Sequence, residues 1–387
     1  MHHPSSLIHY PSAAALLLIL LSSCIEHFDA QLPDSQTQLL VVEGTIIGDQ
    51  DCTFYLSHTF SLNDDDTYLA GHFVSDATVS VKGSDGSSYL GHLTAPGTYQ
   101  VPVGTLKPDV TYSLQIKADG QQYSSEPRYP LTTPDIDSLS YAQPRPDRIV
   151  DIMVTPTASA DTDQPQYYCW TYDEWWEIRT PYHSMWEYLP DSDTIVITTK
   201  RIDRGFHHAP GHQKIIGTNA DYQAGQIRDM RLYTRENSAL CFEYLYCTRI
   251  TQQAISLEEY EYIRLNTQQN EEMGGLFTPQ PSQLPTNIHC DSDPHRQAIG
   301  FVGVCANVAR RDLFIRGAEV GYHMPFDLTI YSFEELDYNS HLELYNAGFR
   351  VFNIDLLTTY WVRQYLLDCT VSPWFCTLTQ PDFWPNE

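Results

Sequence analysis

The sequence predicts a mainly β protein, with a small β-sandwich followed by a larger β-rich part that holds one clear helix. Aromatic residues make up 12% of the chain, led by 26 Tyr, and β-strands favour such side chains. The 24 Pro and 20 Gly divide the chain into short segments, which is typical of strands and turns. Only one segment carries clear helix signals. The prediction of a mainly β protein therefore rests on the composition, on the spacing of Pro and Gly, and on the presence of a single helix.

The amino-terminal residues predict export and a lipid anchor. The apolar run at residues 13–21 is much shorter than the about 20 residues that a membrane-spanning helix needs. It matches the apolar core of a secretory signal peptide, although the segment before it holds no Lys or Arg. The run ends in LSSC at residues 21–24, which resembles the lipobox of bacterial lipoproteins. We therefore expect residues 1–23 to be a signal peptide, Cys24 to carry the lipid and residues 24–38 to be a linker.

The expected address is the outer membrane of a Gram-negative bacterium, on its periplasmic or cell-surface face. The alternative is an ordinary secretory signal in which Cys24 stands by chance. Either address is oxidising, and an even number of cysteines there suggests disulfides. Beside Cys24 the chain has Cys52, Cys169, Cys241, Cys247, Cys290, Cys305, Cys369 and Cys376. No spacing is typical of structural zinc, so we expect neither a metal nor a cofactor.

The chain is strongly acidic, with 22 Lys and Arg against 49 Asp and Glu and a net charge of −27. Such a surface repels phosphate backbones, so the sequence argues against a nucleic-acid partner. The negative charge also argues against electrostatic binding to anionic lipids. Membrane contact is therefore expected through the lipid anchor.

Residues 39–133 are predicted to form the sandwich, because strand-like stretches recur about every ten residues. These stretches are residues 39–46, 53–57, 79–81, 99–103 and 112–116. The segment LKPDVTY at 106–112 resembles the corner of fibronectin type III and other immunoglobulin-like sandwiches. In that corner a tyrosine hydroxyl bonds back to the upstream backbone. We therefore expect an immunoglobulin-like domain with Tyr112 at its corner.

Residues 134–387 are predicted to form the larger β-rich domain, after a proline-containing connector. Its expected strands are residues 149–154, 166–172, 194–199, 231–235, 240–248, 297–304 and 312–315. Ser256 and Glu259 have the spacing of a helix capping box. The helix should run to Met273, because two glycines follow.

Several stretches together resemble one family. They are YYCW at 167–170, SLEEY at 256–260, GLFTPQP at 275–281, TNI at 286–288, AIGFVGV at 298–304 and PDFW at 381–384. With the lipobox and the tyrosine corner, they resemble a Bacteroidota lipoprotein family catalogued as domain of unknown function 4249. The resemblance covers nearly the whole mature chain. It implies an accessory lipoprotein associated with a TonB-dependent outer-membrane receptor, and it implies no established activity.

The carboxyl end departs from the family, which usually has a close cysteine pair there. Leu366 stands at the first position, Cys369 matches the second, and Cys376 lies seven residues beyond it. We predict a disulfide between Cys369 and Cys376, because a proline between them bends the chain. The alternative is a disulfide between one of these two cysteines and Cys241 or Cys247. Cys241 and Cys247 are not expected to pair with each other, because a single strand would hold them about 20 Å apart.

Aromatic residues crowd one stretch of the second domain. Trp170 and Tyr172 share a strand face, and Trp175, Trp176 and Trp186 follow them. Exposed rings of this kind grip sugars or protein partners. These five residues are therefore the candidate ligand or partner surface, and a packed sandwich core is the alternative.

No catalytic motif is present: the sequence has no nucleophile elbow, His-Glu-x-x-His, P-loop or Rossmann pattern. Glu174 and Glu177 suggest the paired carboxylates of a glycosidase, but so close a pair occurs in any acidic protein. The histidines at 207–212 are expected in a solvated loop. The sequence thus favours a non-catalytic binding or accessory lipoprotein. The alternative is an envelope hydrolase that acts on glycans through the cluster at 170–187.

Overall fold

The computed structural model describes residues 39–59, 72–145, 148–158, 164–211, 213–223, 225–272, 285–336, 338–356 and 358–385. Residues 39–387 form one compact unit. The predicted signal peptide, Cys24 and the linker at 24–38 lie outside the described residues. Within the described ranges, no helix is both long enough and apolar enough to cross a membrane.

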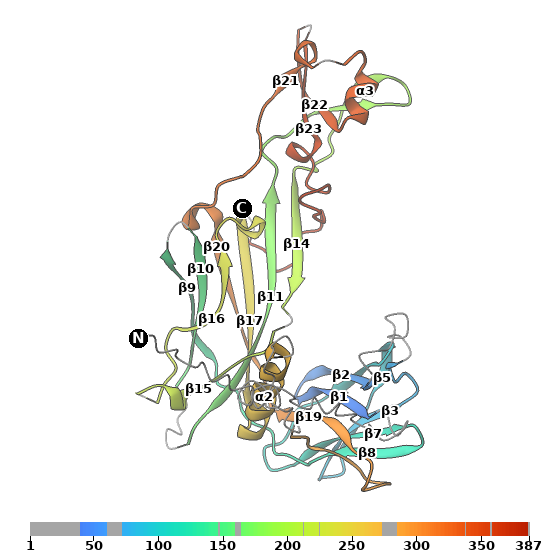
Figure 1. Ribbon diagram of the computed structural model, residues 1–387, viewed down its shortest axis with the longest axis vertical. Helices are drawn as coiled ribbons and strands as arrows, with labels where there is room; N and C mark the ends of the chain where they lie inside the picture. The colour runs from blue at the N-terminus through green and yellow to red at the C-terminus, as the bar shows by residue number, and fades with distance from the viewer. Residues whose placement is uncertain are drawn as a thin grey trace, which may run out of the picture. The chain divides into compact units, whose positions relative to one another are not determined.

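The first part of the larger unit is a β-sandwich (Figure 1). Its strands are β1 (Leu40–Ile47), β2 (Gln50–His58), β3 (Thr78–Gly83), β4 (Ser88–Leu90), β5 (His92–Ala95), β6 (Thr98–Val103), β7 (Tyr112–Ala118), β8 (Gln121–Ser125), β18 (Ile288–Cys290) and β19 (Ala298–Cys305). One sheet has the order β19-β1-β2-β6-β5 and the other β18-β8-β7-β3-β4. Alternate side chains of both sheets meet in one core, where Phe54, Val81 and Leu114 are fully buried. The immunoglobulin-like fold is confirmed.

Two strands of the sandwich, β18 and β19, follow the predicted helix in the sequence. β19 runs parallel to β1, and β18 pairs with β8. The sequence places residues 297–304 in the second domain, and this division at residue 133 is corrected: residues 288–305 complete the sandwich. Gly300 has a φ of 140°, and a Cβ there would meet the carbonyl oxygen of Val42 on β1. Glycine is therefore required where the two strands approach.

The tyrosine corner lies where the sequence predicts it. The Tyr112 hydroxyl accepts a hydrogen bond from the backbone N–H of Lys107 at 2.9 Å, and the tyrosine is 1% exposed. The bond ties the turn before β7 to the core of the sandwich. This contact confirms the bond back to the upstream backbone.

We expect Tyr112→Phe to lower the free energy of unfolding by about 0.5–1.5 kcal/mol, because the Lys107 N–H loses its acceptor. Tyr55→Phe is the matched control, since Tyr55 is 53% exposed. Urea unfolding of both variants measures the difference. A Tyr112→Phe midpoint equal to that of the control would contradict the role of the corner.

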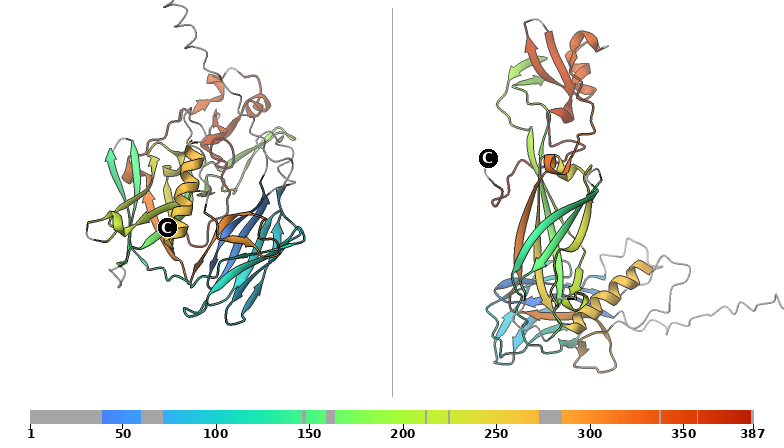
Figure 2. Two further views of the ribbon diagram at one scale, coloured as in Figure 1. Left: turned by 60° about the horizontal axis from the view of Figure 1, so that its bottom comes forward. Right: turned by 90° about the vertical axis from the view of Figure 1, so that its left-hand side faces the viewer.

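The second part holds two more sheets, which pack against each other (Figures 1 and 2). The three-stranded sheet has the order β16-β10-β9, from β9 (Ile136–Arg145), β10 (Ile149–Pro156) and β16 (Met230–Glu236). The other has the order β14-β11-β17-β20, from β11 (Tyr167–Arg179), β14 (Arg204–Pro210), β17 (Leu245–Ile255) and β20 (Ala309–Arg316), with β15 (Ile215–Thr218) beside β11. The facing sides share a core that includes Val150, Trp170 and Ile250, all fully buried.

The predicted helix is α2 (Leu257–Glu272). Ser256 Oγ accepts the N–H of Glu259 at 3.2 Å, which is half of the expected capping box. The other half is absent, because the Glu259 side chain is turned into the protein and is 8% exposed. The two glycines expected to end the helix lie outside the described residues.

A small module is built from two separate stretches of the chain. It comprises the hairpin β12 (Trp186–Leu189) and β13 (Thr194–Ile197), the strands β21 (Tyr331–Ser332), β22 (Phe349–Asp355) and β23 (Thr358–Arg363), and α3 (His341–Asn346). The hairpin belongs to the connection between β11 and β14. Tyr188 of the hairpin packs with Val351 of β22 and with Trp361 of β23, which is fully buried. Short 3-10 helices lie at Asn219–Asp221, Leu240–Phe242, Gly317–Val320, Phe333–Glu335 and Gln364–Leu366.

Two predictions about the second part are wrong: the strand at residues 240–248 and the loop at residues 207–212. Cys241 lies in the 3-10 helix Leu240–Phe242 and Cys247 in β17, so residues 240–248 are not one strand. The 20 Å separation that we inferred for these two cysteines therefore has no basis. His207 and His208 lie on β14 rather than in a loop, while His212 is outside the described residues.

The eight cysteines within the described ranges are all buried thiols. The predicted pair is nevertheless brought together: the Cys376 N–H donates to the Cys369 carbonyl at 2.9 Å, and both cysteines pack in one apolar cluster with Trp374. The structure thus holds no disulfide among the described residues. The Cys369–Cys376 bond stays a prediction, which peptide mapping without reductant would test.

Candidate functional site

Two of the five predicted aromatic residues belong to the core. Trp170 is 0% exposed, and its Nε1 donates to Oε1 of Gln252 at 2.9 Å. Tyr172 is stacked on Tyr233 of β16, with ring centroids 4.2 Å apart. Sheet β16-β10-β9 covers this face of β11. The surface expected at Trp170 and Tyr172 is therefore corrected to a packed core.

Trp175 and Trp176 lie on opposite faces of β11, and each stacks on a histidine of β14. The centroids are 4.6 Å apart for Trp175 and His208, and 4.3 Å apart for Trp176 and His207. The Arg249 guanidinium lies over the Trp175 ring at 5.3 Å. Trp175 borders a cavity of about 310 Å³. Both of its sides are occupied by the chain itself, so it offers a ligand little free ring surface.

Glu174 and Glu177 do not form a carboxylate pair, because they too point to opposite faces of β11. Glu174 accepts the Nε of Arg235 at 2.8 Å and the Tyr246 hydroxyl. On the other face Glu177 accepts the Nε of Arg204 at 2.8 Å. Paired carboxylates in glycosidases flank one bond. This pair cannot do so, since the sheet separates the two groups.

A second carboxylate, Glu243, lies near Glu177 and was missed by sequence reasoning. Burial raises the pKa of Glu243 to about 7, and the charge of Glu177 adds to this effect. Burial alone would raise the pKa of Glu177 as well, but hydrogen bonds from two arginines and from Trp384 outweigh it and lower that pKa. Glu243 also accepts the Arg179 N–H at 2.7 Å.

Two neighbouring carboxyl groups, one with a lowered and one with a raised pKa, are typical of sites that catalyse by general acid–base chemistry. A catalytic site also needs space for a substrate beside the carboxylates. Neither Glu177 nor Glu243 borders any of the three cavities described here, and Glu177 is 1% exposed. Hydrogen bonds from Arg179, Arg204 and Trp384 thus hold the Glu177 carboxylate in a buried position. No local sequence signal marks the two carboxylates, because Glu243 lies far from Glu177 along the chain.

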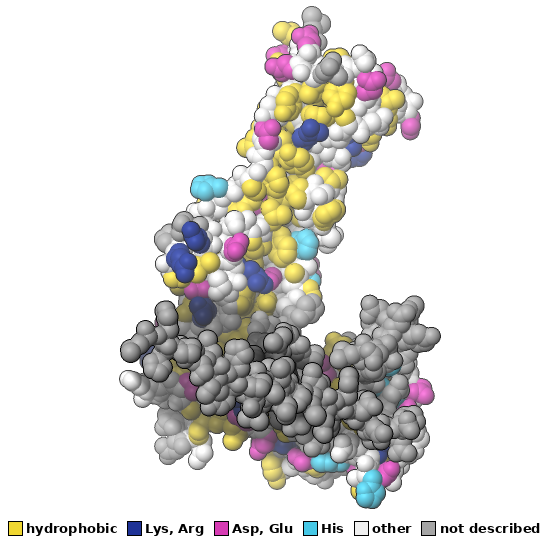
Figure 3. All heavy atoms as spheres, viewed as in Figure 1, with side chains coloured by type: hydrophobic (Ala, Val, Ile, Leu, Met, Phe, Trp, Pro, Cys, Tyr) yellow, Lys and Arg dark blue, Asp and Glu magenta, His cyan; other side chains and the backbone are white. Residues whose placement is uncertain are grey.

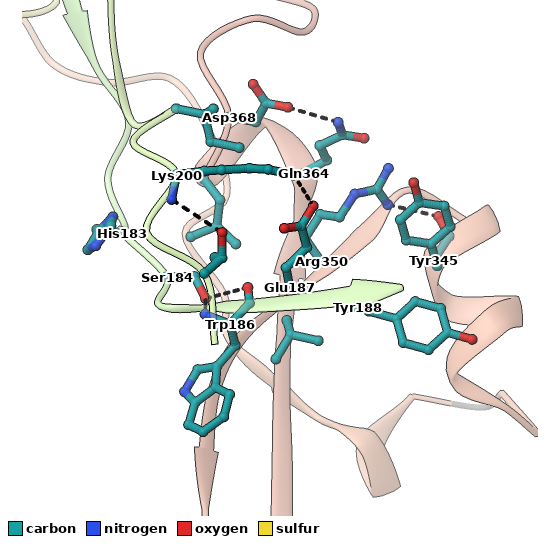
Figure 4. Close-up of a pocket in the computed structure, with 14 residues that line it drawn as sticks. His183, Ser184, Trp186, Glu187, Tyr188, Lys200, Tyr345, Arg350, Gln364 and Asp368 are labelled. Atoms are coloured by element: carbon teal, nitrogen blue, oxygen red, sulfur yellow. Dashed lines mark hydrogen bonds and ion pairs between the residues drawn. The ribbon is translucent and has the colours of Figure 1, made fainter. Parts of the chain in front are cut away.

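Trp186, the fifth predicted aromatic residue, borders a cavity of about 220 Å³ in the small module. Figure 4 shows the Lys200 and Glu187 side chains joined there, with Arg350 pointing toward Tyr345. The Lys200 Nζ lies 2.6 Å from the Glu187 carboxylate. Arg350 donates to the backbone carbonyl of Tyr345 at 2.9 Å, and burial lowers its pKa. These charges are already engaged within the module, so the cavity offers shape and apolar surface more than reactive groups.

The small module also exposes large apolar side chains that sequence reasoning did not single out. They are Met185 at 60% exposure, Ile197 at 73%, Leu342 at 42% and Leu356 at 96%. Figure 3 shows apolar side chains gathered over this part of the surface, with acidic side chains at its margins. Exposed acidic residues of the module include Asp191, Asp193, Glu334 and Asp355. An apolar surface with a charged rim is typical of a protein-binding site.

Asn287, in the TNI stretch of the family resemblance, has a structural role. It is 1% exposed, its amide donates to the Val302 carbonyl at 3.0 Å, and its Oδ1 accepts the Val302 N–H at 2.9 Å. The side chain thus replaces a strand partner for β19. The stretch at 275–281 lies outside the described residues.

The fold is that of a mainly β protein whose immunoglobulin-like sandwich is followed by further sheets. The family described as Domain of unknown function (DUF4249) matches residues 25–311, and the chain belongs to that family. No curated protein matches the chain.

Two solved structures are similar to parts of the chain. The Yersinia pseudotuberculosis adhesin InvE is 15% identical, with a TM-score of 0.16, and the match covers 56% of this chain and 54% of the adhesin chain. A two-domain fibronectin type III segment of chicken tenascin is 10% identical, with a TM-score of 0.13, over 55% of this chain and 88% of the segment. The chain thus spans about half of the adhesin that it matches. Scores this low carry no argument about function.

Proposed function

We propose that this protein is a non-catalytic, lipid-anchored outer-membrane lipoprotein that binds a partner protein through its small module. The partner that we propose is a TonB-dependent receptor, as the family resemblance suggests. The observation that carries the proposal is the set of exposed apolar side chains on the module, with Ile197 and Leu356 the most exposed.

The small module is better suited to binding a partner protein than to catalysing a reaction. Burying a large apolar side chain stabilises a complex by about 1.5–3 kcal/mol, so a few such residues suffice for a specific contact. Its rim is acidic, which favours a partner whose contact surface is apolar at the centre and basic around it. Of the charged groups in the module, Lys200 and Glu187 form an ion pair with each other.

The second candidate function is an envelope hydrolase that acts on glycans. The separated pKa values of Glu177 and Glu243 favour it. The burial of Glu177, which is 1% exposed, speaks against it, since a glycan needs an open groove. Glycan-release assays of the wild type and of Glu243→Gln would decide: release that the substitution abolishes would replace the binding proposal.

We expect Cys24 to be the acylated amino terminus of the mature protein. The motivation is the lipobox-like end of the signal peptide, LSSC. Metabolic labelling with an alkyne fatty acid should mark the wild type and leave Cys24→Ala unmarked. Equal labelling of both proteins would refute the anchor.

We expect a photo-crosslinking residue placed at Ile197 to capture an outer-membrane protein in living cells, because Ile197 is 73% exposed on the module. The same residue placed at Leu90 of the sandwich, which is 65% exposed, is the matched control. Mass spectrometry identifies the crosslinked product. Identical products from both positions, or none from Ile197, would contradict binding through the module.

A further inference from the structure

The cavity that Trp175 borders lies beside the edge strand β14, and the carboxyl-terminal segment 375–381 forms much of its wall. The segment is tied to the strand where Phe206 and Thr377 exchange backbone hydrogen bonds of 2.7 and 2.8 Å. The volume of about 310 Å³ is at the lower end of the about 300–1,000 Å³ that small-molecule sites occupy. The residues that line the cavity lie outside the small module, so a ligand here would be a function beyond the proposed one.

The wall of the cavity combines aromatic rings with neutral polar side chains. None of the described residues that line it is Asp, Glu, Lys or Arg. Arginines that contact the lining rings are paired with other carboxylates: Arg249 lies 2.7 Å from Asp312, and Arg204 lies 2.8 Å from Glu177. A charged ligand would therefore find no free counter-charge in the wall, and the composition favours a neutral ligand.

His207 of β14 brings a polar group without a partner to this cavity. Its ring is stacked on Trp176 with the centroids 4.3 Å apart, which fixes its orientation. Neither ring nitrogen has a hydrogen-bond partner among the described residues, and Nδ1 is buried. A neutral imidazole has one donor and one acceptor nitrogen, whereas a hydroxyl both donates and accepts. A ligand hydroxyl therefore matches His207 in either tautomer.

The carboxyl-terminal segment adds two more polar groups. Within the part of the chain that the structure describes, the side chains of Thr379 and Gln380 have no hydrogen-bond partner, and both residues line the cavity. A hydroxyl and an amide also bind ligand hydroxyl groups. His208 is less available, because its Nε2 already lies 3.5 Å from a carboxylate oxygen of Asp173.

Phe375 holds an aromatic ring at the cavity from a strained backbone conformation. Its φ is 49°, which is rare for a bulky side chain, and the residue is 65% exposed. The flanking Trp374 and Cys376 are 3% and 7% exposed, so the buried neighbours impose this conformation on the residue between them. Strained residues that the surrounding structure holds in place cluster at ligand sites. The exposed ring offers a flat apolar surface beside the polar groups.

We infer that this cavity binds one ring of a neutral pyranose sugar. The ring of Phe375 would pack against the C–H face of the sugar, and His207 with Gln380 would bind its hydroxyl groups. Trp175 does not provide the stacking surface, because His208 is stacked on it and the Arg249 guanidinium lies over it. The site is one of binding alone, since no carboxylate lines the described wall to act on a glycosidic bond.

The test is saturation-transfer NMR of the mature full-length protein, in a detergent without a sugar head group, with the methyl pyranosides of glucose, galactose and mannose. We expect saturable transfer to at least one of the three. The methyl uronoside of that same sugar, which adds a carboxylate, should bind at least about tenfold more weakly. Saturable transfer to none of the three, or equal binding of the uronoside, would overturn the inference.

A trisaccharide of the best-bound sugar distinguishes two sources of the ring. Tighter binding than that of the methyl pyranoside indicates a glycan chain, whose neighbouring rings contact the protein outside the cavity. Equal or weaker binding indicates a free sugar.

Two variants make the test specific. Phe375→Gly should weaken binding of the pyranoside at least about tenfold and should still fold, because glycine adopts a positive φ without steric cost. His207→Phe keeps a ring to stack on Trp176 and removes both nitrogens, and the same loss is expected. Leu378→Ala is the matched control, because Leu378 lies in the same segment, is 49% exposed and does not line the cavity.

Thermal unfolding confirms that each variant is folded. Undiminished binding by folded Phe375→Gly or folded His207→Phe would overturn the inference. So would a loss of binding in Leu378→Ala as large as that in Phe375→Gly.

Discussion

Replacing Trp384 by alanine is expected to lower the free energy of unfolding by about 3–5 kcal/mol. Trp384 is 3% exposed and meets Phe206 and Phe314 edge-on, with ring centroids 5.6 Å and 5.5 Å away. Its Nε1 donates to the buried Glu177 carboxylate at 2.9 Å. The substitution therefore opens a cavity and removes one hydrogen bond from a buried charge.

Guanidinium unfolding followed by circular dichroism measures this effect. Leu378→Ala is the matched control in the same carboxyl-terminal segment, because Leu378 is 49% exposed and should change stability by no more than about 0.5 kcal/mol. A Trp384→Ala loss as small as that of the control would show that the carboxyl-terminal segment is not anchored to the sheet.

The same contact predicts a pH dependence. The folded-state pKa of Glu177 is lowered, so the stability that it contributes is present above its unfolded pKa and is lost as the pH falls through the folded value. Trp384→Phe keeps the ring packing and removes the indole donor. The stability difference between this variant and the wild type should therefore shrink in acid, and a difference that grows in acid would contradict the assigned sign.

The second large effect is expected at Arg235. Arg235→Met leaves the Glu174 carboxylate, which is 6% exposed, without its ion-pair partner, and should lower stability by about 3–5 kcal/mol. The double variant Glu174→Leu with Arg235→Met should regain part of this loss, because it removes the stranded charge as well. Thermal unfolding of the single and double variants measures both effects.

Lys200→Met is the control for Arg235→Met. It breaks the ion pair with Glu187, in which the lysine side chain is 64% exposed, so at most about 1 kcal/mol should be lost. A double variant less stable than Arg235→Met alone would show that Glu174 has adequate partners without the arginine.

Local patterns predicted the elements of the fold well, and they failed where partners are distant. Tyr112 and the helix after Ser256 were found because their signals are contained in a few consecutive residues. The pairing of β19 with β1 was missed, because alternation in residues 298–305 identifies a strand and says nothing about its neighbour. Cys241 was misassigned to a strand, because the apolar pattern of residues 240–248 does not show that a 3-10 helix, Leu240–Phe242, precedes the strand β17.

The candidate site was predicted less well for a related reason. An aromatic residue has the same sequence signature in a core, as at Trp170, and on a surface. Exposure decides between them, and exposure depends on which sheet covers which face. The exposed apolar side chains of Ile197 and Leu356 were not foreseen, because exposure is defined by what surrounds a residue in space.

Native co-purification measures directly whether the protein binds a receptor through its small module. The acylated wild-type protein and the variant Ile197→Asp with Leu356→Asp would be isolated from detergent-solubilised outer membranes, and bound proteins would be quantified by mass spectrometry. Our account predicts that a TonB-dependent receptor accompanies the wild type in near-equal amount and that its recovery falls at least about tenfold with the variant, which corresponds to about 1.4 kcal/mol of lost binding. Absence of any such receptor from the wild-type preparation, or equal recovery with the folded variant, would contradict it.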